Sequence, residues 1–173
     1  LLSGSPHIYA SVKKTFIDLV AYIKESTTTK QSIDSFQASE PQYKIFISKK
    51  SEDYIFAKEV YDFLTKKGHH VFLSEESLQA TGSSEYMKAI DEALEHAKHL
   101  VVIATKPEYL LSGWVEAEWR VFINEKRSGR KNGNIVTLIP TDAPPNMLPM
   151  SLRYYEVIPF GEPGLAKLLH YMN

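Results

Sequence analysis

The sequence predicts a doubly wound α/β fold with five parallel strands, preceded by an amphipathic helix. After Pro41, five short runs of apolar, often β-branched residues alternate with helical patterns. Runs that are apolar on both faces are typical of buried parallel strands, and crossover helices between such strands cover an open sheet on both sides. The predicted strands are residues 43–48, 71–74, 100–104, 135–139 and 156–160.

Four helices are expected between and after these strands. The first keeps one apolar face from Phe56 to Leu64, and Gly68 is the residue type that commonly ends a helix after its last turn. Residues 87–97 repeat an apolar face between the second and third strands. A third helix is expected from Trp114 to about Gly129, and a last one around residues 165–169.

The first forty residues differ from the rest in pattern. Apolar residues recur every three or four positions from about residue 6 to 25, which predicts one amphipathic helix. This helix would either dock on its own domain or pair with a second copy of the chain. Residues 27–41 are polar and are typical of a linker, so we expect an N-terminal segment, 1–40, and an α/β domain, 41–173.

Composition excludes several classes of function. The 173 residues carry a formal net charge of −1, and their basic residues are dispersed, which argues against nucleic acid as the main partner. The chain has no cysteine and no apolar run near the ~20 residues needed to cross a bilayer. With no leader sequence apparent, a cytoplasmic protein without a membrane partner is expected.

The common enzyme signatures are missing. No glycine-rich phosphate loop follows a strand, since Gly82 and Gly113 are isolated, and no nucleophile elbow is present. The histidines at 69, 70, 96 and 99 do not form a set of three or four ligands. The sequence therefore predicts no bound metal.

Ligands of doubly wound sheets bind beyond the carboxyl ends of the strands. The segments expected there are residues 48–53, 74–83, 105–113 and 141–150. The helix from Trp114 starts directly from the third segment, so Glu118 lies one turn into a helix that begins at this edge.

Glu118 is a carboxylate where the helical pattern calls for an apolar side chain. The apolar arc predicted for this helix consists of Trp114, Val115, Val121 and Phe122. At ~100° per residue, Glu118 falls in the middle of that arc, whereas Glu116 falls on the polar side. Glu118 could reach solvent, form a buried ion pair with a lysine, or be catalytic. Trp114, one turn earlier on the same face, would give the anion an aromatic neighbour suited to a flat cation.

The ordered set of motifs resembles the TIR (Toll/interleukin-receptor) domain, from about Tyr43 to the C-terminus. The residues that carry the resemblance are Phe46-Ile47-Ser48, Val71-Phe72-Leu73, Leu78, Gly82, Tyr109, Ser112, Trp114 and Glu118.

This resemblance implies a flavodoxin-like sheet and, in the NAD-cleaving branch of the family, an essential glutamate four residues after a tryptophan. Trp114 and Glu118 stand in those positions. The implied activity is an NAD glycohydrolase that gives nicotinamide and ADP-ribose, or a cyclic isomer of ADP-ribose. NAD is then the substrate, and no cofactor is expected.

The resemblance implies further contacts around the glutamate. Ser48, Lys49 and Lys50 occupy the loop that contacts phosphate and ribose in the family, where arginines are common. Gln79 and Tyr109 are further candidates for substrate contacts. The acidic residue and the proline usual in the second loop are absent, since Ser74 and Thr81 stand near those positions.

Family resemblance also implies activation by self-association, with the loop from Ser74 to Gly82 completing the site of a neighbouring copy, and a role in immune or antiphage signalling. A non-catalytic adaptor that recruits other TIR domains is the main alternative. A related enzyme that transfers free nucleosides is a third.

Overall fold

A five-stranded parallel sheet forms the centre of the computed structural model, which describes residues 43–78, 83–144, 146 and 148–173. The strand order is β2-β1-β3-β4-β5. The strands are β1 (Ile45–Lys49), β2 (Val71–Phe72), β3 (His99–Ile103), β4 (Ile135–Ile139) and β5 (Glu156–Pro159). The predicted doubly wound fold is confirmed. The N-terminal helix and linker predicted for residues 1–40 lie outside the described residues.

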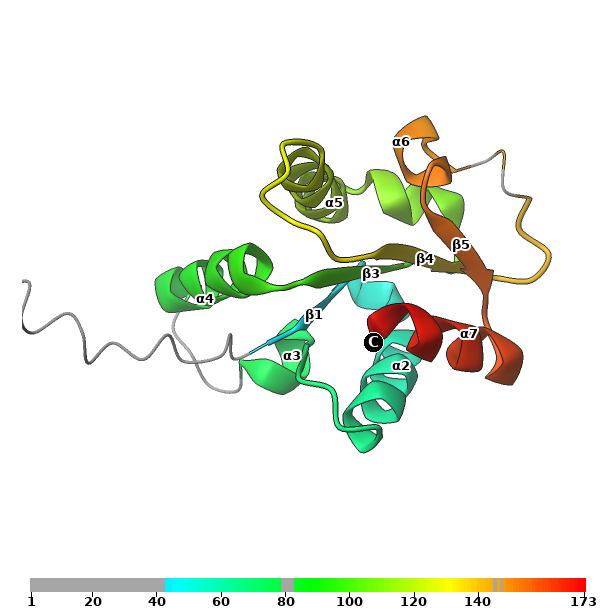
Figure 1. Cartoon of the computed structure of the whole chain (residues 1–173), viewed down its shortest axis with the longest axis horizontal. Helices are drawn as coiled ribbons and strands as arrows, with labels where there is room; N and C mark the ends of the chain where they lie inside the picture. Colours follow the sequence, from blue (N-terminus) through cyan, green and yellow to red (C-terminus); the bar gives the residue numbers. More distant parts are fainter. Residues whose placement is uncertain (1–42, 79–82, 145, 147) are drawn as a thin grey trace, which may run out of the picture. The chain divides into compact units, whose positions relative to one another are not determined.

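Helices cover both faces of the sheet. They are α2 (Tyr54–Lys66), α3 (Ser74–Ser77), α4 (Ser83–His96), α5 (Gly113–Arg127), α6 (Met150–Arg153) and α7 (Glu162–Met172). One apolar cluster joins the sheet to α4, α5 and α6, and the other joins it to α2 and α7. Figure 1 shows α5 and α6 on one side of the sheet and α2 and α7 on the other. None of the described helices is long and apolar enough to cross a membrane.

Short elements that lie in predicted loops follow four of the strands. These are α3, α6 and the 3-10 helices Ser51–Asp53 and Pro107–Leu111. Each is only three to five residues long, too short for helical periodicity to be read from sequence. The consequence for the site is local, because α3 places two carboxylates beside the end of β1.

The buried face of α5 differs from the predicted apolar face by a rotation about the helix axis. Val115 and Phe122 are buried as expected, but Trp114 is 55% exposed and Val121 is 50% exposed. Trp119 is buried instead, and its indole nitrogen donates to the carbonyl of Leu110. Glu118 therefore lies on the flank of the buried face rather than in its middle.

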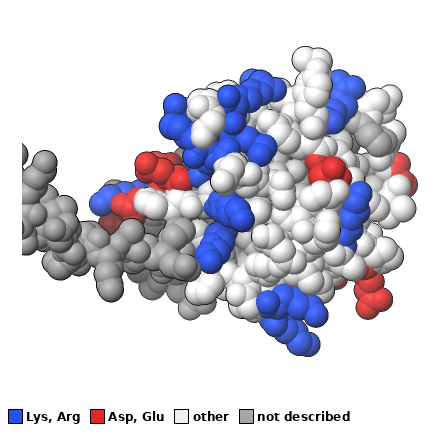
Figure 2. Space-filling view, viewed as in Figure 1, with Lys and Arg blue, Asp and Glu red and all other residues white. Residues whose placement is uncertain are grey.

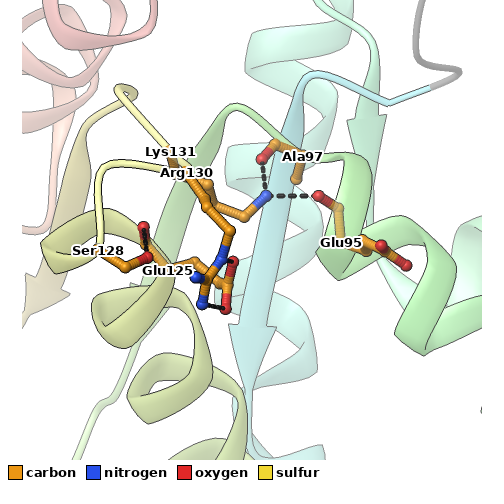
Figure 3. A network of polar contacts seen from close by, with 6 residues as sticks. All are labelled: Glu95, Ala97, Glu125, Ser128, Arg130 and Lys131. Atoms are coloured by element: carbon orange, nitrogen blue, oxygen red, sulfur yellow. Dashed lines mark hydrogen bonds and ion pairs between the residues drawn. The ribbon is translucent and has the colours of Figure 1, made fainter.

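The turn from α5 to β4 ties α5 to the end of α4. Lys131 Nζ donates to the carbonyls of Glu95 and Ala97, both at 2.6 Å, and so satisfies groups at the carboxyl end of α4 (Figure 3). Gly133 packs on Lys98, since a Cβ at Gly133 would lie 1.7 Å from the Lys98 carbonyl oxygen. The carboxyl ends of α4 and α5 are thus held together.

Candidate active site

A cavity of about 120 Å³ opens at the carboxyl end of β1, bordered by α3, α4 and α5. It lies beside the point where the strand order reverses, between β1 and β3, where doubly wound sheets bind ligands. Its lining residues are Phe46, Ile47, Lys49, Ser51, Ser74, Glu75, Tyr86, Ile90, Trp114 and Glu118. A cavity of similar size, on the order of 150 Å³, admits a benzene ring. The space therefore suits one ring, not a whole dinucleotide.

Ser48 holds the carboxylate of Glu118. Side chains of β1 alternate between the two faces, so Ile45 and Ile47 face α2, whereas Phe46 and Ser48 face α5. The Ser48 hydroxyl donates to Glu118 Oε2 at 2.5 Å. Ser48 is only 1% exposed, so it supports the carboxylate from behind and does not line the cavity.

Burial raises the pKa of Glu118 to about 7. Desolvation of the carboxylate is the largest cause, and the negative charges of Asp91 and Glu75 act in the same direction. The Ser48 hydrogen bond and the charge of Lys49 oppose this rise without cancelling it. Glu118 can therefore gain or lose a proton near neutral pH. The prediction that it is a misfit carboxylate agrees with this environment.

Trp114 forms the outer wall beside Glu118. The two residues are one helical turn apart on α5, and both line the cavity, while the Trp114 ring remains half exposed. Tyr86 and Ile90 of α4 also line the cavity. The result is a ring-sized space with an aromatic surface and a carboxylate.

Lys49 reaches the cavity but is paired with an acid. Its side chain is 4% exposed, and its ammonium forms an ion pair with Glu75 of α3. The hydroxyl of Tyr54 donates to Glu76, the next residue of α3. These two contacts hold α3 against the carboxyl end of β1. A phosphate that bound Lys49 would have to compete with Glu75.

The remaining predicted contacts lie elsewhere. Lys50 pairs with Glu52 at 2.6 Å, and its ammonium lies 4.5 Å from the centre of the Tyr109 ring. Neither Lys50 nor Tyr109 lines the cavity. Gln79 lies outside the described residues. Substrate contacts by these residues and by Ser48 stay predictions.

Three residues that line the cavity, Glu75 of α3 and Tyr86 and Ile90 of α4, were not predicted as site residues. Tyr86 and Ile90 are spaced four apart within a predicted helix, so their shared face could have been read from the pattern. No helical pattern indicated Glu75, because it lies in a segment predicted to be a loop. Its pairing with Lys49 joins residues 26 positions apart.

A second buried carboxylate lies at the same edge of the sheet. Asp53 is fully buried and accepts hydrogen bonds from the backbone nitrogen and the hydroxyl of Thr105. These bonds tie the segment after β1 to the segment after β3. Asp53 therefore fixes the loops at the switch point.

The arrangement around Glu118 suits a flat, cationic ring. An aromatic face attracts a cation, and a desolvated carboxylate beside it supplies the opposite charge. In the part of the chain that the structure describes, no three His, Cys, Asp or Glu side chains cluster as ligands for a metal ion.

Comparisons with known proteins give one family. A family model described as the TIR domain matches residues 45–169. No curated protein sequence matches the chain. Two solved structures of a metazoan TIR-STING receptor from C. gigas are similar in fold, one of them in complex with 2',3'-cGAMP. Their identities are 18% and 16%, with TM-scores of 0.58 and 0.59 and coverage of 75% and 76% of this chain. The chain spans about two fifths of the length of these receptors, 39% and 40%.

Proposed function

The chain belongs to the TIR-domain family, and we propose that it is an NAD glycohydrolase that breaks the bond between nicotinamide and ribose. The observation that carries this proposal is the desolvated carboxylate of Glu118, held by Ser48 and placed beside the exposed ring of Trp114. The cavity between them has the size of a single ring.

The proposed reaction needs little proton transfer to the leaving group. The bond between ribose C1' and the pyridinium nitrogen breaks, and its electron pair goes to nitrogen, so nicotinamide leaves as a neutral molecule. Positive charge then moves onto the ribose. Water attacks C1' and loses a proton, which gives ADP-ribose. A single carboxylate can serve such a reaction, whereas glycosidases that expel a poor leaving group need an acid as well.

Glu118 would act on the charge that develops on the ribose. In its ionised form it would lie beside the oxocarbenium-like transition state and stabilise it electrostatically. Its interaction with that charge would be strong, because few water molecules screen the carboxylate. The bound pyridinium would itself favour ionisation, since a nearby positive charge lowers the pKa of a carboxyl group.

Trp114 would bind the ring before the bond breaks. A half-exposed indole beside the cavity offers a stacking face to a cationic pyridinium. The adenosine half of NAD would have to lie outside this cavity, because the ring-sized space does not hold it. Self-association is proposed as the condition for activity, since a neighbouring copy could supply contacts to that half.

The test is release of nicotinamide from NAD by the concentrated 173-residue chain under crowding or crosslinking. We expect nicotinamide and an ADP-ribose product from the wild type and a loss of at least about a hundredfold in Glu118→Ala. Glu116→Ala is the matched control, because Glu116 pairs with Arg120 on the outer side of α5.

Two outcomes would contradict the proposal. No nicotinamide release by the assembled wild type would favour a non-catalytic adaptor. Equal release by the wild type and Glu118→Ala would support the proposed NAD glycohydrolase activity but rule out the role proposed for Glu118. Separation of linear from cyclic ADP-ribose in the same reaction would identify the product.

A further inference from the structure

A second pocket lies at the opposite end of the sheet from Glu118. It has a volume of about 350 Å³ and surrounds the start of the edge strand β2. Tyr43, Tyr61, His69 and His70 contribute four of its lining side chains. Its size falls within the roughly 300–1,000 Å³ of small-molecule sites. None of the residues assigned to the proposed NAD site borders it.

The aromatic walls of this amino-end pocket come from both layers of the molecule. Tyr43 packs on the α4 and α5 side, with its ring edge-on to Phe72 at 5.1 Å between ring centres. Tyr61 of α2 packs on the other side of the sheet. The pocket therefore has ring surfaces that rest on two apolar clusters.

Two lysines adjoin the pocket in the chain, between its lining residues Thr65 and Gly68. Lys66 is the last residue of α2 and Lys67 follows it; both are exposed, and no carboxylate occurs between residues 63 and 71. A lysine at the end of a helix also interacts with the helix dipole. That role accounts for Lys66 in the last turn of α2, but not for Lys67, His69 and His70, which follow the helix. Figure 2 shows Lys and Arg side chains in several separate groups on a visible face that is mostly uncharged, with smaller groups of Asp and Glu.

The two histidines are held by their backbone while their rings remain available. The carbonyl of His70 accepts hydrogen bonds from the backbone nitrogens of residues 44 and 45, and the nitrogen of His69 donates to Leu64. Among the described residues, neither imidazole has a hydrogen-bond partner. Burial, with the charge of Lys44, lowers the pKa of His69. Its ring is therefore neutral near pH 7 and offers one donor and one acceptor.

We propose that this amino-end pocket binds a nucleoside monophosphate, with the base against the Tyr and His rings and the phosphate near Lys66 and Lys67. Bases stack on aromatic side chains whatever their sequence, and lysine binds phosphate as a point charge. The volume holds one nucleotide, which favours a mononucleotide over a nucleic-acid strand. The site is distinct from the proposed NAD site and does not depend on it.

The test is a titration of the full-length chain with 5'-AMP, followed by amide chemical shifts in NMR. We expect shifts at residues 68–71 that saturate with AMP. Adenosine alone and inorganic phosphate alone should bind more weakly, because each supplies one half of the contacts. Shifts confined to Ser48, Trp114 and Glu118 would overturn the proposal, because AMP would then occupy the cavity at the other end of the sheet.

Substitutions distinguish binding in the pocket from nonspecific attraction of AMP to surface lysines. The pair Lys66→Gln and Lys67→Gln should weaken AMP binding by about fivefold or more, as expected for two surface charge contacts. His70→Ala should weaken it as well, since this exposed ring is lost without disturbing the core. The matched control pair, Lys88→Gln and Lys167→Gln, removes two exposed lysines elsewhere and should leave the affinity unchanged.

Three further results would overturn the proposal. The first is the absence of shifts at residues 68–71 at millimolar AMP. The second is an equal loss of affinity in the control pair, which would mean unspecific attraction. The third is much tighter binding of a single-stranded oligonucleotide than of AMP, which would assign the surface to a polymer.

Discussion

Asp53 and Glu118 are two carboxylates at the same edge of the sheet, and their surroundings differ. Asp53 is fully buried, and the backbone nitrogen and hydroxyl of Thr105 both donate to it. Glu118 is less buried, and among the described residues it accepts one hydrogen bond, from Ser48. Its pKa rises to about 7, chiefly because of desolvation.

The difference shows that depth of burial alone does not determine how far the charge of a carboxylate is compensated by its surroundings. The number of donors around the charge matters more, because each hydrogen bond to the ionised form replaces lost water. Asp53 uses its charge to hold two loops together. The charge of Glu118 is only partly compensated by the protein. Because Glu118 lines a cavity, a cationic ligand bound there could balance the rest of that charge.

The largest effect on stability is expected for Asp53→Ala. Two donors of Thr105 would lose a charged acceptor, and we expect the free energy of unfolding to fall by about 3 kcal/mol or more. Urea denaturation measures this loss. Asp62→Ala, which removes an exposed acid of α2 that pairs with Lys58, should cost less than about 0.5 kcal/mol. Similar losses in both variants would mean that the buried hydrogen bonds of Asp53 stabilise the fold no more than an exposed ion pair does.

Glu118→Gln should act in the opposite direction. The pKa of Glu118 is raised from 4.5 to about 7 on folding, so the folded state binds the proton more tightly than the unfolded state. Stability due to this group is full below pH 4.5 and declines as pH rises to about 7. A neutral glutamine avoids that decline.

We therefore expect Glu118→Gln to raise the free energy of unfolding by about 2–3 kcal/mol at pH 8 and by about 1 kcal/mol at pH 5. Urea denaturation at the two pH values gives both numbers. A gain that does not change with pH would mean that the glutamate is not desolvated, and so would a loss of stability at pH 8.

Thr137→Val extends the comparison to a neutral group. Thr137 lies in the middle of β4, is fully buried, and its hydroxyl has no hydrogen-bond partner within the described residues. Valine has nearly the same shape and carries no polar group, so we expect a gain of about 1 kcal/mol in thermal or urea unfolding. A loss of stability would show that the hydroxyl has a partner, such as an internal water molecule.

Ser48→Ala should have the smallest effect, and this effect should act through the pKa of Glu118. The Ser48 hydroxyl lowers the pKa of Glu118 by stabilising its charged form. Without it, the pKa should rise, and kcat/KM for NAD at pH 7 should fall by several-fold, on the order of 1 kcal/mol. The loss should shrink at higher pH, where the glutamate ionises again. An equal loss at all pH values would indicate a direct substrate contact instead.

The sequence predicted the sheet well because its physical signal is local. The central strands are short runs that are largely apolar on both faces, such as residues 135–139, and β4 begins and ends at those residues. The position of Glu118 at the ligand edge follows from its place one turn into the helix that begins after the third strand. Helical periodicity could not show which side of α5 faces the sheet, so Trp114 and Val121 were placed with the buried residues.

The contacts that complete the site could not be read from sequence. Lys49 meets Glu75, Ser48 meets Glu118 and Asp53 meets Thr105, and these pairs are separated by 26, 70 and 52 residues. Such pairings depend on how strands and loops are arranged in three dimensions. The family resemblance indicated which carboxylate to examine, but not that a buried serine holds it.

The most direct test of the proposed role of Glu118 is the pH dependence of nicotinamide release by the assembled wild type, compared with Glu118→Gln. We predict that kcat/KM for NAD rises with pH and levels off above an apparent pKa near 7, since the free enzyme must ionise Glu118 to bind and stabilise the cationic ribose. Glu118→Gln should show no such rise and should lose nearly all activity. A wild-type profile that is flat from about pH 5 to pH 9, or a Glu118→Gln variant that keeps its activity, would contradict the role assigned to this carboxylate.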